Sequence, residues 1–179
     1  MGVGNYYDIA AKVAAAAGAD GSAGATRGIL LCGSGMGMAI VANKQKGVRA
    51  AVVENEAAAV NSRSINDSNV LTLGAMITAP EEAVKIVDAW MSAQFKGPAP
   101  ANEGKGWPAE IEGFLTQSLP AIARLEGQMA AATAGAAGAG EGSGGYEPPC
   151  ALCALAGSEA HPFGAVAGVE GAECVQVRR

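Results

Sequence analysis

Residues 28–47 read GILLCGSGMGMAIVANKQKG, and this stretch decides the fold class. The apolar residues 29–31 predict a buried strand that ends at Cys32. A glycine-rich turn follows, and residues 36–46 predict a helix. A strand, a glycine turn and a helix start together form an anion-binding arrangement, because the first N–H groups of a helix have no partners within it.

Cys32 stands at the carboxyl end of this predicted strand, beside the glycine turn. The positive end of a helix stabilises a thiolate, so Cys32 is a candidate base or nucleophile. An ordinary buried cysteine is the alternative interpretation. The turn itself either cradles a ligand with its backbone N–H groups or only connects the strand to the helix.

Strands and helices alternate along the first half of the chain. This alternation predicts an α/β fold, a three-layer Rossmann-like parallel sheet with helices on both faces. With only three strands, the sheet should expose an edge beside Ile29 and Leu30. The helix at 109–126, a partner chain or nothing would cover this edge, and a partner chain is the favoured alternative. The strands are expected at 28–32, 48–53 and 69–73, and the helices at 6–17, 36–46, 54–64 and 80–95.

Composition divides the chain into three parts. Residues 1–95 form the α/β domain, and residues 96–131 form a linker plus a C-terminal helix that Pro120 should kink or break. Residues 132–179 are rich in Gly and Ala and carry few side chains able to form a core, so we expect this tail to be largely disordered.

Charge and hydropathy exclude some classes of partner. The net charge is −5 and no basic run exists, so we expect no nucleic acid partner. The apolar runs are too short to cross a bilayer, and no secretory signal pattern opens the chain. We therefore expect a cytoplasmic protein with reduced thiols, or an organellar one if the true N-terminus lies upstream.

The tail holds Cys150, Cys153, Cys174 and the single histidine, His161. A zinc site or a redox pair is an alternative function for these residues, but the spacings match no standard module. We expect no metal and no cofactor.

Several ordered stretches together resemble the type B ribose-5-phosphate isomerase and galactose-6-phosphate isomerase family. They are CGSGMGM at 32–38, ANK at 42–44, GVRAA at 47–51 and SRSINDSNVLTLGA at 62–75. The likeness runs from about residue 6 to residue 95. Residues 109–126 and 149–156 are also similar to a plant protein that joins this domain to a C-terminal cupin.

The resemblance implies a dimeric enzyme that interconverts aldose and ketose forms of a sugar phosphate through an enediolate. In that scheme Cys32 is the base that moves a proton between C1 and C2, and the Ser34 hydroxyl assists. The N–H groups of Gly33, Gly35, Met36 and Gly37 stabilise the enediolate oxygen. Asn66 binds the open-chain sugar.

Three departures from the family pattern favour a catalytically inactive relative that binds a phosphosugar or acts through dimerisation. The chain starts after the family's opening strand with its Asp-His-Ala-Gly-like motif, as a truncated gene product would. Ile65 stands where active members commonly have a ring-opening histidine. Residues 96–103 lack the arginines that grip the phosphate. Arg49 and Arg63 are expected to be surface charges, and Arg63 is the better candidate of the two for a structural role.

Overall fold

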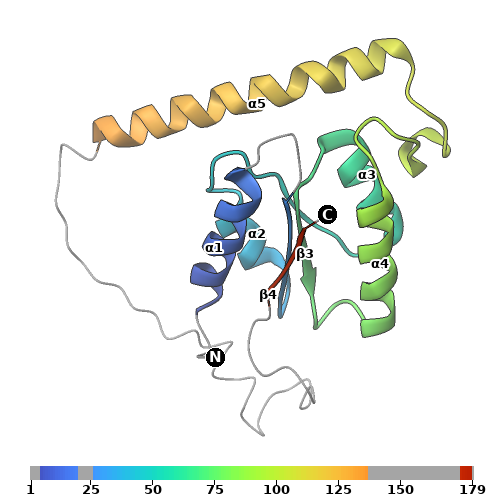
Figure 1. Cartoon of the computed structure of the whole chain (residues 1–179), viewed down its shortest axis with the longest axis horizontal. Helices are drawn as coiled ribbons and strands as arrows, with labels where there is room; N and C mark the ends of the chain where they lie inside the picture. Colours follow the sequence, from blue (N-terminus) through green and yellow to red (C-terminus); the bar gives the residue numbers. More distant parts are fainter. Residues whose placement is uncertain (1–4, 20–25, 137–173, 179) are drawn as a thin grey trace, which may run out of the picture.

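The computed structural model describes residues 5–19, 26–136 and 174–178. Within them a central sheet lies between two pairs of helices, and a long helix, α5, lies across one end of the molecule (Figure 1). The elements are α1 (Tyr6–Ala19), β1 (Thr26–Cys32), α2 (Met36–Ala42), β2 (Ala50–Val52), α3 (Glu56–Asn66), β3 (Val70–Gly74), α4 (Pro80–Ser92), η2 (Pro100–Asn102), α5 (Ala109–Ala136) and β4 (Cys174–Arg178).

The sheet has the order β2-β3-β1-β4. The strands β1, β2 and β3 are parallel, with Gly28 beside Val70 and Cys32 beside Gly74. The predicted parallel three-strand core is therefore confirmed. The amino ends of all three strands lie at one edge of the sheet and their carboxyl ends at the other.

Alternation along the strands divides the core between the two faces of the sheet. Leu30 packs with residues of α1 and α2, while Ile29 packs against α3 and α4. Trp90 of α4 is fully buried on the second face. These two clusters produce the predicted three layers, with helices covering both faces of the sheet.

The helix α2 is shorter than the predicted 36–46 because Asn43 is tied to the next strand. Its side-chain amide donates to the Ala50 carbonyl at 2.9 Å and accepts from the Ala50 N–H at 2.8 Å. These two bonds stop the helix and align the start of β2. Of the predicted kink or break at Pro120, the break is wrong, because α5 continues through Pro120 and ends at Ala136.

The strand β4 was not predicted, and it covers the edge of the sheet beside β1. It pairs antiparallel with β1, from Thr26 opposite Arg178 to Leu30 opposite Cys174. The β1 edge is thus occupied by β4 of this chain, so the expectation that a partner chain covers it is wrong. Residues 132–136, which continue α5, and residues 174–178 of β4 depart from the predicted disorder of the tail. The rest of that tail, with Cys150, Cys153 and His161, lies outside the described residues.

The expectation that Arg49 and Arg63 are surface charges is also wrong. Both bind Asp67, whose side chain is 9% exposed, with nitrogen–oxygen distances of 2.8 Å. Arg63 also donates to the Ser68 carbonyl and lies 5.9 Å from the Trp90 ring centroid. This network holds the turn between α3 and β3, where Asp67 has a left-handed backbone with φ of 48°.

No helix within the described ranges has both the length and the apolar character that a membrane span needs.

Candidate functional site

The candidate site is the loop between β1 and α2, at the carboxyl edge of the sheet. Cys32 ends β1 and is half-buried, packed against the core cluster on the α1 and α2 face. The N–H of Gly35 donates to its Sγ at a distance of 3.1 Å. The sulfur is thus oriented as an acceptor towards the loop.

Two glycines let the loop adopt this shape. Gly35 has φ of 75°, a left-handed conformation that glycine adopts without strain. A Cβ on Gly37, in the first turn of α2, would lie 3.1 Å from the Tyr6 ring. The first residue of α1 therefore packs directly beside the start of α2.

The outer face of the loop is open to solvent. Gly33 is exposed, and Met36 is 50% exposed. The Ser34 hydroxyl accepts a long hydrogen bond of 3.4 Å from the Met36 N–H. For the described part of the chain, the N–H groups of Ser34 and Gly37 have no acceptor, so they can donate to an anionic oxygen placed over the loop.

Asn66 is not part of this loop. It ends α3, is exposed, and precedes β3, whose first residue Val70 lies at the amino edge of the sheet. Cys32 lies beside Gly74, the last residue of β3. With a rise of about 3.3 Å per residue, the two edges are roughly 13 Å apart. The structure brings Cys32 and residues 33–37 together but does not bring Asn66 to them.

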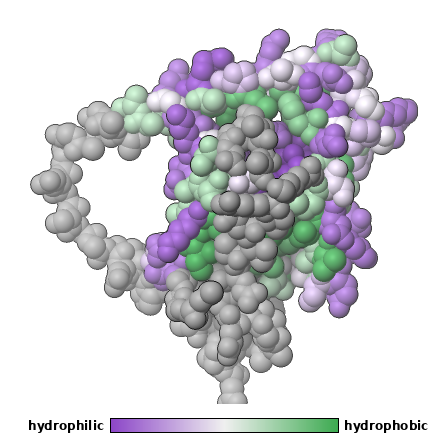
Figure 2. Space-filling model, viewed as in Figure 1, coloured by the Kyte–Doolittle hydropathy of each residue, from purple (hydrophilic) through white to green (hydrophobic). Residues whose placement is uncertain are grey.

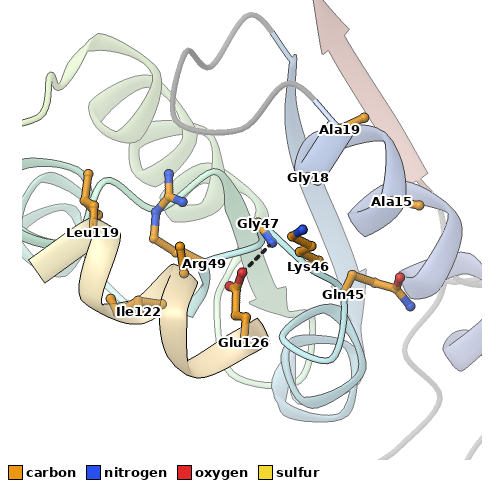
Figure 3. A pocket seen from close by; sticks show the side chains of 11 residues that line it. Ala15, Gly18, Ala19, Gln45, Lys46, Gly47, Arg49, Leu119, Ile122 and Glu126 are labelled. Atoms are coloured by element: carbon orange, nitrogen blue, oxygen red, sulfur yellow. Dashed lines mark hydrogen bonds between the residues drawn. The ribbon is translucent and has the colours of Figure 1, made fainter. Parts of the chain in front are cut away.

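Two cavities occur beneath α5, on the side of the molecule where Asn66 lies. One of about 430 Å³ is lined by Asn66 and Arg49 together with Leu125 and Met129 of α5. The other, of about 550 Å³, lies between the end of α1, the turn after α2 and the helix α5 (Figure 3). In it, Glu126 accepts a hydrogen bond of 3.1 Å from the Gly47 N–H. Neither cavity includes Cys32, whose loop is an open surface instead.

The helix α5 presents both apolar and polar side chains to solvent on the face shown in Figure 2. Phe114 is 67% exposed and Leu125 is 57% exposed. Near the candidate loop, Ile40 of α2 and Met76 after β3 are likewise at least half exposed. Apolar surface thus remains uncovered at both edges of the sheet.

The sequence interpretation missed the residues that hold the loop in place from β3. Gly74 touches the Ser34 peptide, and the N–H groups of Ala75 and Met76 donate to the carbonyls of Cys32 and Gly33, each at 2.9 Å. The signal was present, because a glycine ends the predicted strand 69–73, but only the parallel pairing of β1 with β3 shows what it touches.

Known proteins share this arrangement. The family model described as Ribose/Galactose Isomerase matches residues 3–104. The chain belongs to this family of sugar-phosphate isomerases. The match covers the whole α/β core and includes the Cys32 loop.

Two curated relatives and one solved structure illustrate the likeness. The DNA damage-repair/toleration protein DRT102 of Arabidopsis thaliana is 40% identical over 124 residues, which are 69% of this chain and 40% of that protein. The D-erythrulose-4-phosphate isomerase of Pectobacterium atrosepticum is 49% identical over 71 residues, 40% of this chain and 47% of the enzyme. This chain thus spans less than half the length of these two relatives.

The solved structure is the ribose-5-phosphate isomerase B of Mycoplasma genitalium with bound ribulose-5-phosphate. It is 32% identical, with a TM-score of 0.57, and the likeness covers 69% of this chain and 70% of that one. The fold of the described core is therefore that of type B ribose-5-phosphate isomerases.

Proposed function

We propose that this chain binds a phosphorylated sugar over the Cys32 loop and moves a proton between its C1 and C2 carbons. The observation that carries the proposal is the Cys32 sulfur at the carboxyl end of β1, oriented by the Gly35 N–H at 3.1 Å. In parallel α/β sheets, ligands bind at the carboxyl ends of the strands. The relatives' names support a sugar phosphate as the ligand.

Each part of the loop has a role in this chemistry. Cys32 as a thiolate takes the proton from C2 of the aldose and returns it to C1 of the enediolate, while the hydroxyl proton on O2 passes to O1. The N–H groups of Ser34 and Gly37, which have no acceptor among the described residues, stabilise the developing charge on the oxygen, with Gly33 and Met36 lining the exposed rim. The Ser34 hydroxyl donates to the same oxygen.

Asn66 enters this proposal only through a second copy of the chain. One chain places Asn66 and Cys32 at opposite edges of the sheet, so the two can contact one sugar only across a homodimer. The exposed apolar side chains of α2 and α5 support such an association. The homodimer is part of the proposal.

Slow turnover is expected with sugars that must first open a ring. Ring opening needs a proton donor and acceptor, and the side chain of Ile65 supplies neither. Ribose 5-phosphate is mainly cyclic. Erythrose 4-phosphate cannot close a five-membered ring, because its O4 carries the phosphate, so it needs no opening step.

The test is isomerisation of both sugar phosphates by the purified chain and by Cys32→Ala. We expect the four-carbon substrate to be converted faster, and Cys32→Ala to abolish conversion of either. For ribose 5-phosphate we expect turnover at least a hundredfold below an ordinary rate of about ten per second. Activity that survives Cys32→Ala would contradict the role of the thiol.

The second candidate function is phosphosugar binding without catalysis. It is favoured by Ile65 and by the separation of Asn66 from Cys32 within one chain. Calorimetric titration with a non-reactive sugar phosphate distinguishes the two candidates. Binding without any conversion of either substrate would support the non-catalytic function.

A further inference from the structure

The end of β3 is in direct backbone contact with the Cys32 loop. A Cβ added to Gly74 would lie 2.7 Å from the carbonyl carbon of Ser34 and 2.8 Å from its carbonyl oxygen. Real Cβ atoms essentially never approach this closely, and the atoms they would meet are backbone atoms that cannot rotate away. Any side chain at position 74 therefore displaces the loop.

The displaced atoms belong to the group that orients the cysteine. The carbonyl of Ser34 and the N–H of Gly35 are parts of one planar peptide unit. That N–H donates to Sγ of Cys32 at 3.1 Å. A shift of the Ser34 carbonyl therefore moves the donor away from the sulfur.

The contact is close from both sides. A Cβ on Gly35 would lie 2.9 Å from the carbonyl carbon of Leu73. The next two residues after Gly74 also bind the loop, since Ala75 and Met76 donate to the carbonyls of Cys32 and Gly33. The end of β3 thus acts as the surface on which the loop is shaped.

We propose that Gly74 is a positioning residue for Cys32: by leaving room for the Ser34–Gly35 peptide against β3, it holds the Gly35 N–H on the sulfur. The proposal rests on the proposed function for the role of Cys32 in chemistry. Gly74 lies on the neighbouring strand β3, contacts no substrate, and acts on Cys32 through the loop.

Gly28 provides a matched control, because it is also a strand glycine with no room for a side chain. Its Cβ would lie 2.7 Å from Val13 Cγ1 and 3.2 Å from Val70 Cγ2. These contacts are in the core at the amino edge of the sheet, away from the loop. Gly28→Ala therefore introduces similar crowding without touching the peptide that faces Cys32.

The experiment follows the reactivity of the Cys32 thiol directly. In a background with Cys150→Ser, Cys153→Ser and Cys174→Ser, Cys32 is the single thiol. The alkylation rate with iodoacetamide is measured across neutral and alkaline pH, alongside the thermal midpoint. We expect Gly74→Ala to slow alkylation at neutral pH by about threefold or more and to move the pH profile upward. Gly28→Ala should lower the thermal midpoint and leave the pH profile unchanged.

A pH profile in Gly74→Ala that matches the background would overturn the proposal, as would an equal shift in Gly28→Ala. If Gly74→Ala does not fold, Ala75→Pro serves instead, because it removes the N–H that donates to Cys32. An unchanged profile in that variant would likewise overturn it. Failure of the proposed function is a separate result. If the background variant converts no sugar phosphate but Gly74→Ala still moves the pH profile, the positioning role of Gly74 is supported and the proposed function is contradicted.

Discussion

At the scale of single residues, the most concentrated interactions lie away from the candidate loop, around Asp67. One carboxylate oxygen binds Arg49 and the other binds Arg63, and all three side chains are largely buried. A buried carboxylate shared by two arginines leaves both cations without a counter-charge when it is removed. Asp67 therefore determines how the turn before β3 is held.

We predict that Asp67→Asn destabilises the fold by about 3–5 kcal/mol, measured by urea denaturation. Asparagine keeps the size of the side chain and tolerates the left-handed backbone, so the loss reports on the charge. Glu82→Gln is the control, because the exposed Lys85–Glu82 pair should contribute less than about 1 kcal/mol. Equal losses of unfolding free energy in the two variants would mean that the buried network stabilises the fold no more than an exposed ion pair does.

The sequence predicts those parts of the candidate site that depend on neighbouring residues in the chain. An apolar run that ends in Cys32 and a cluster of glycines predict the strand, the turn and the helix start without knowledge of the rest of the chain. The full role of Asp67 was not readable, because Arg63 is a local partner four residues away but Arg49 becomes its neighbour only after folding. The same is true of Gly74, whose partner Ser34 is 40 residues away.

At the scale of elements, α5 is the least integrated part of the described structure. Among its residues 109–131, whose side chains the structure describes, Leu115 alone is buried, while Phe114, Leu125 and Met129 are more than half exposed. A helix of this length depends on packing of an apolar face rather than on propensity alone. Its attachment to the domain includes the contact between Glu126 and the Gly47 N–H (Figure 3).

We predict that Glu126→Ala loosens this attachment and exposes the Gly47 amide. Hydrogen exchange at Gly47 should accelerate about fivefold, the effect of losing one hydrogen bond of about 1 kcal/mol. Glu110→Ala, in the first turn of the same helix, is the control and should leave that amide unchanged. Unaltered exchange in Glu126→Ala would show that α5 is held by its apolar contacts alone.

The helices were predicted better in type than in length. Periodicity and an opening proline identified α4, but the end of α2 depends on Asn43 binding Ala50 across the loop. Pro120 illustrates the opposite error. Its missing N–H predicts a break, yet the helix continues with Pro120 exposed on its surface, where the ring does not disturb the core.

At the scale of the whole molecule, the sheet combines a parallel core with one antiparallel strand from the far end of the sequence. The strand β4 covers the edge of β1 that three strands alone would leave open. An open edge beside apolar residues invites pairing with other chains. Covering of the β1 edge by β4 should therefore reduce aggregation of the protein at high concentration.

We predict that Val177→Pro, which disrupts the pairing opposite Arg27, increases aggregation on gentle heating. Light scattering measures the effect, with the unmodified chain at equal concentration as reference. Val175→Thr is the control, since threonine keeps the backbone donor and suits a strand. Scattering that is the same for all three chains would show that β4 does not protect the edge.

The pairing of β4 with β1 also bears on how the chain is made. Thr26 and Arg178 meet across roughly 150 intervening residues, so this pairing has a much larger separation along the chain than the parallel pairs. During synthesis, β1, β2 and β3 leave the ribosome and can assemble first. The outer edge of β1 then stays unpaired until residues 174–178 emerge, and that interval is when a nascent chain is most open to chaperones or to a neighbouring nascent copy.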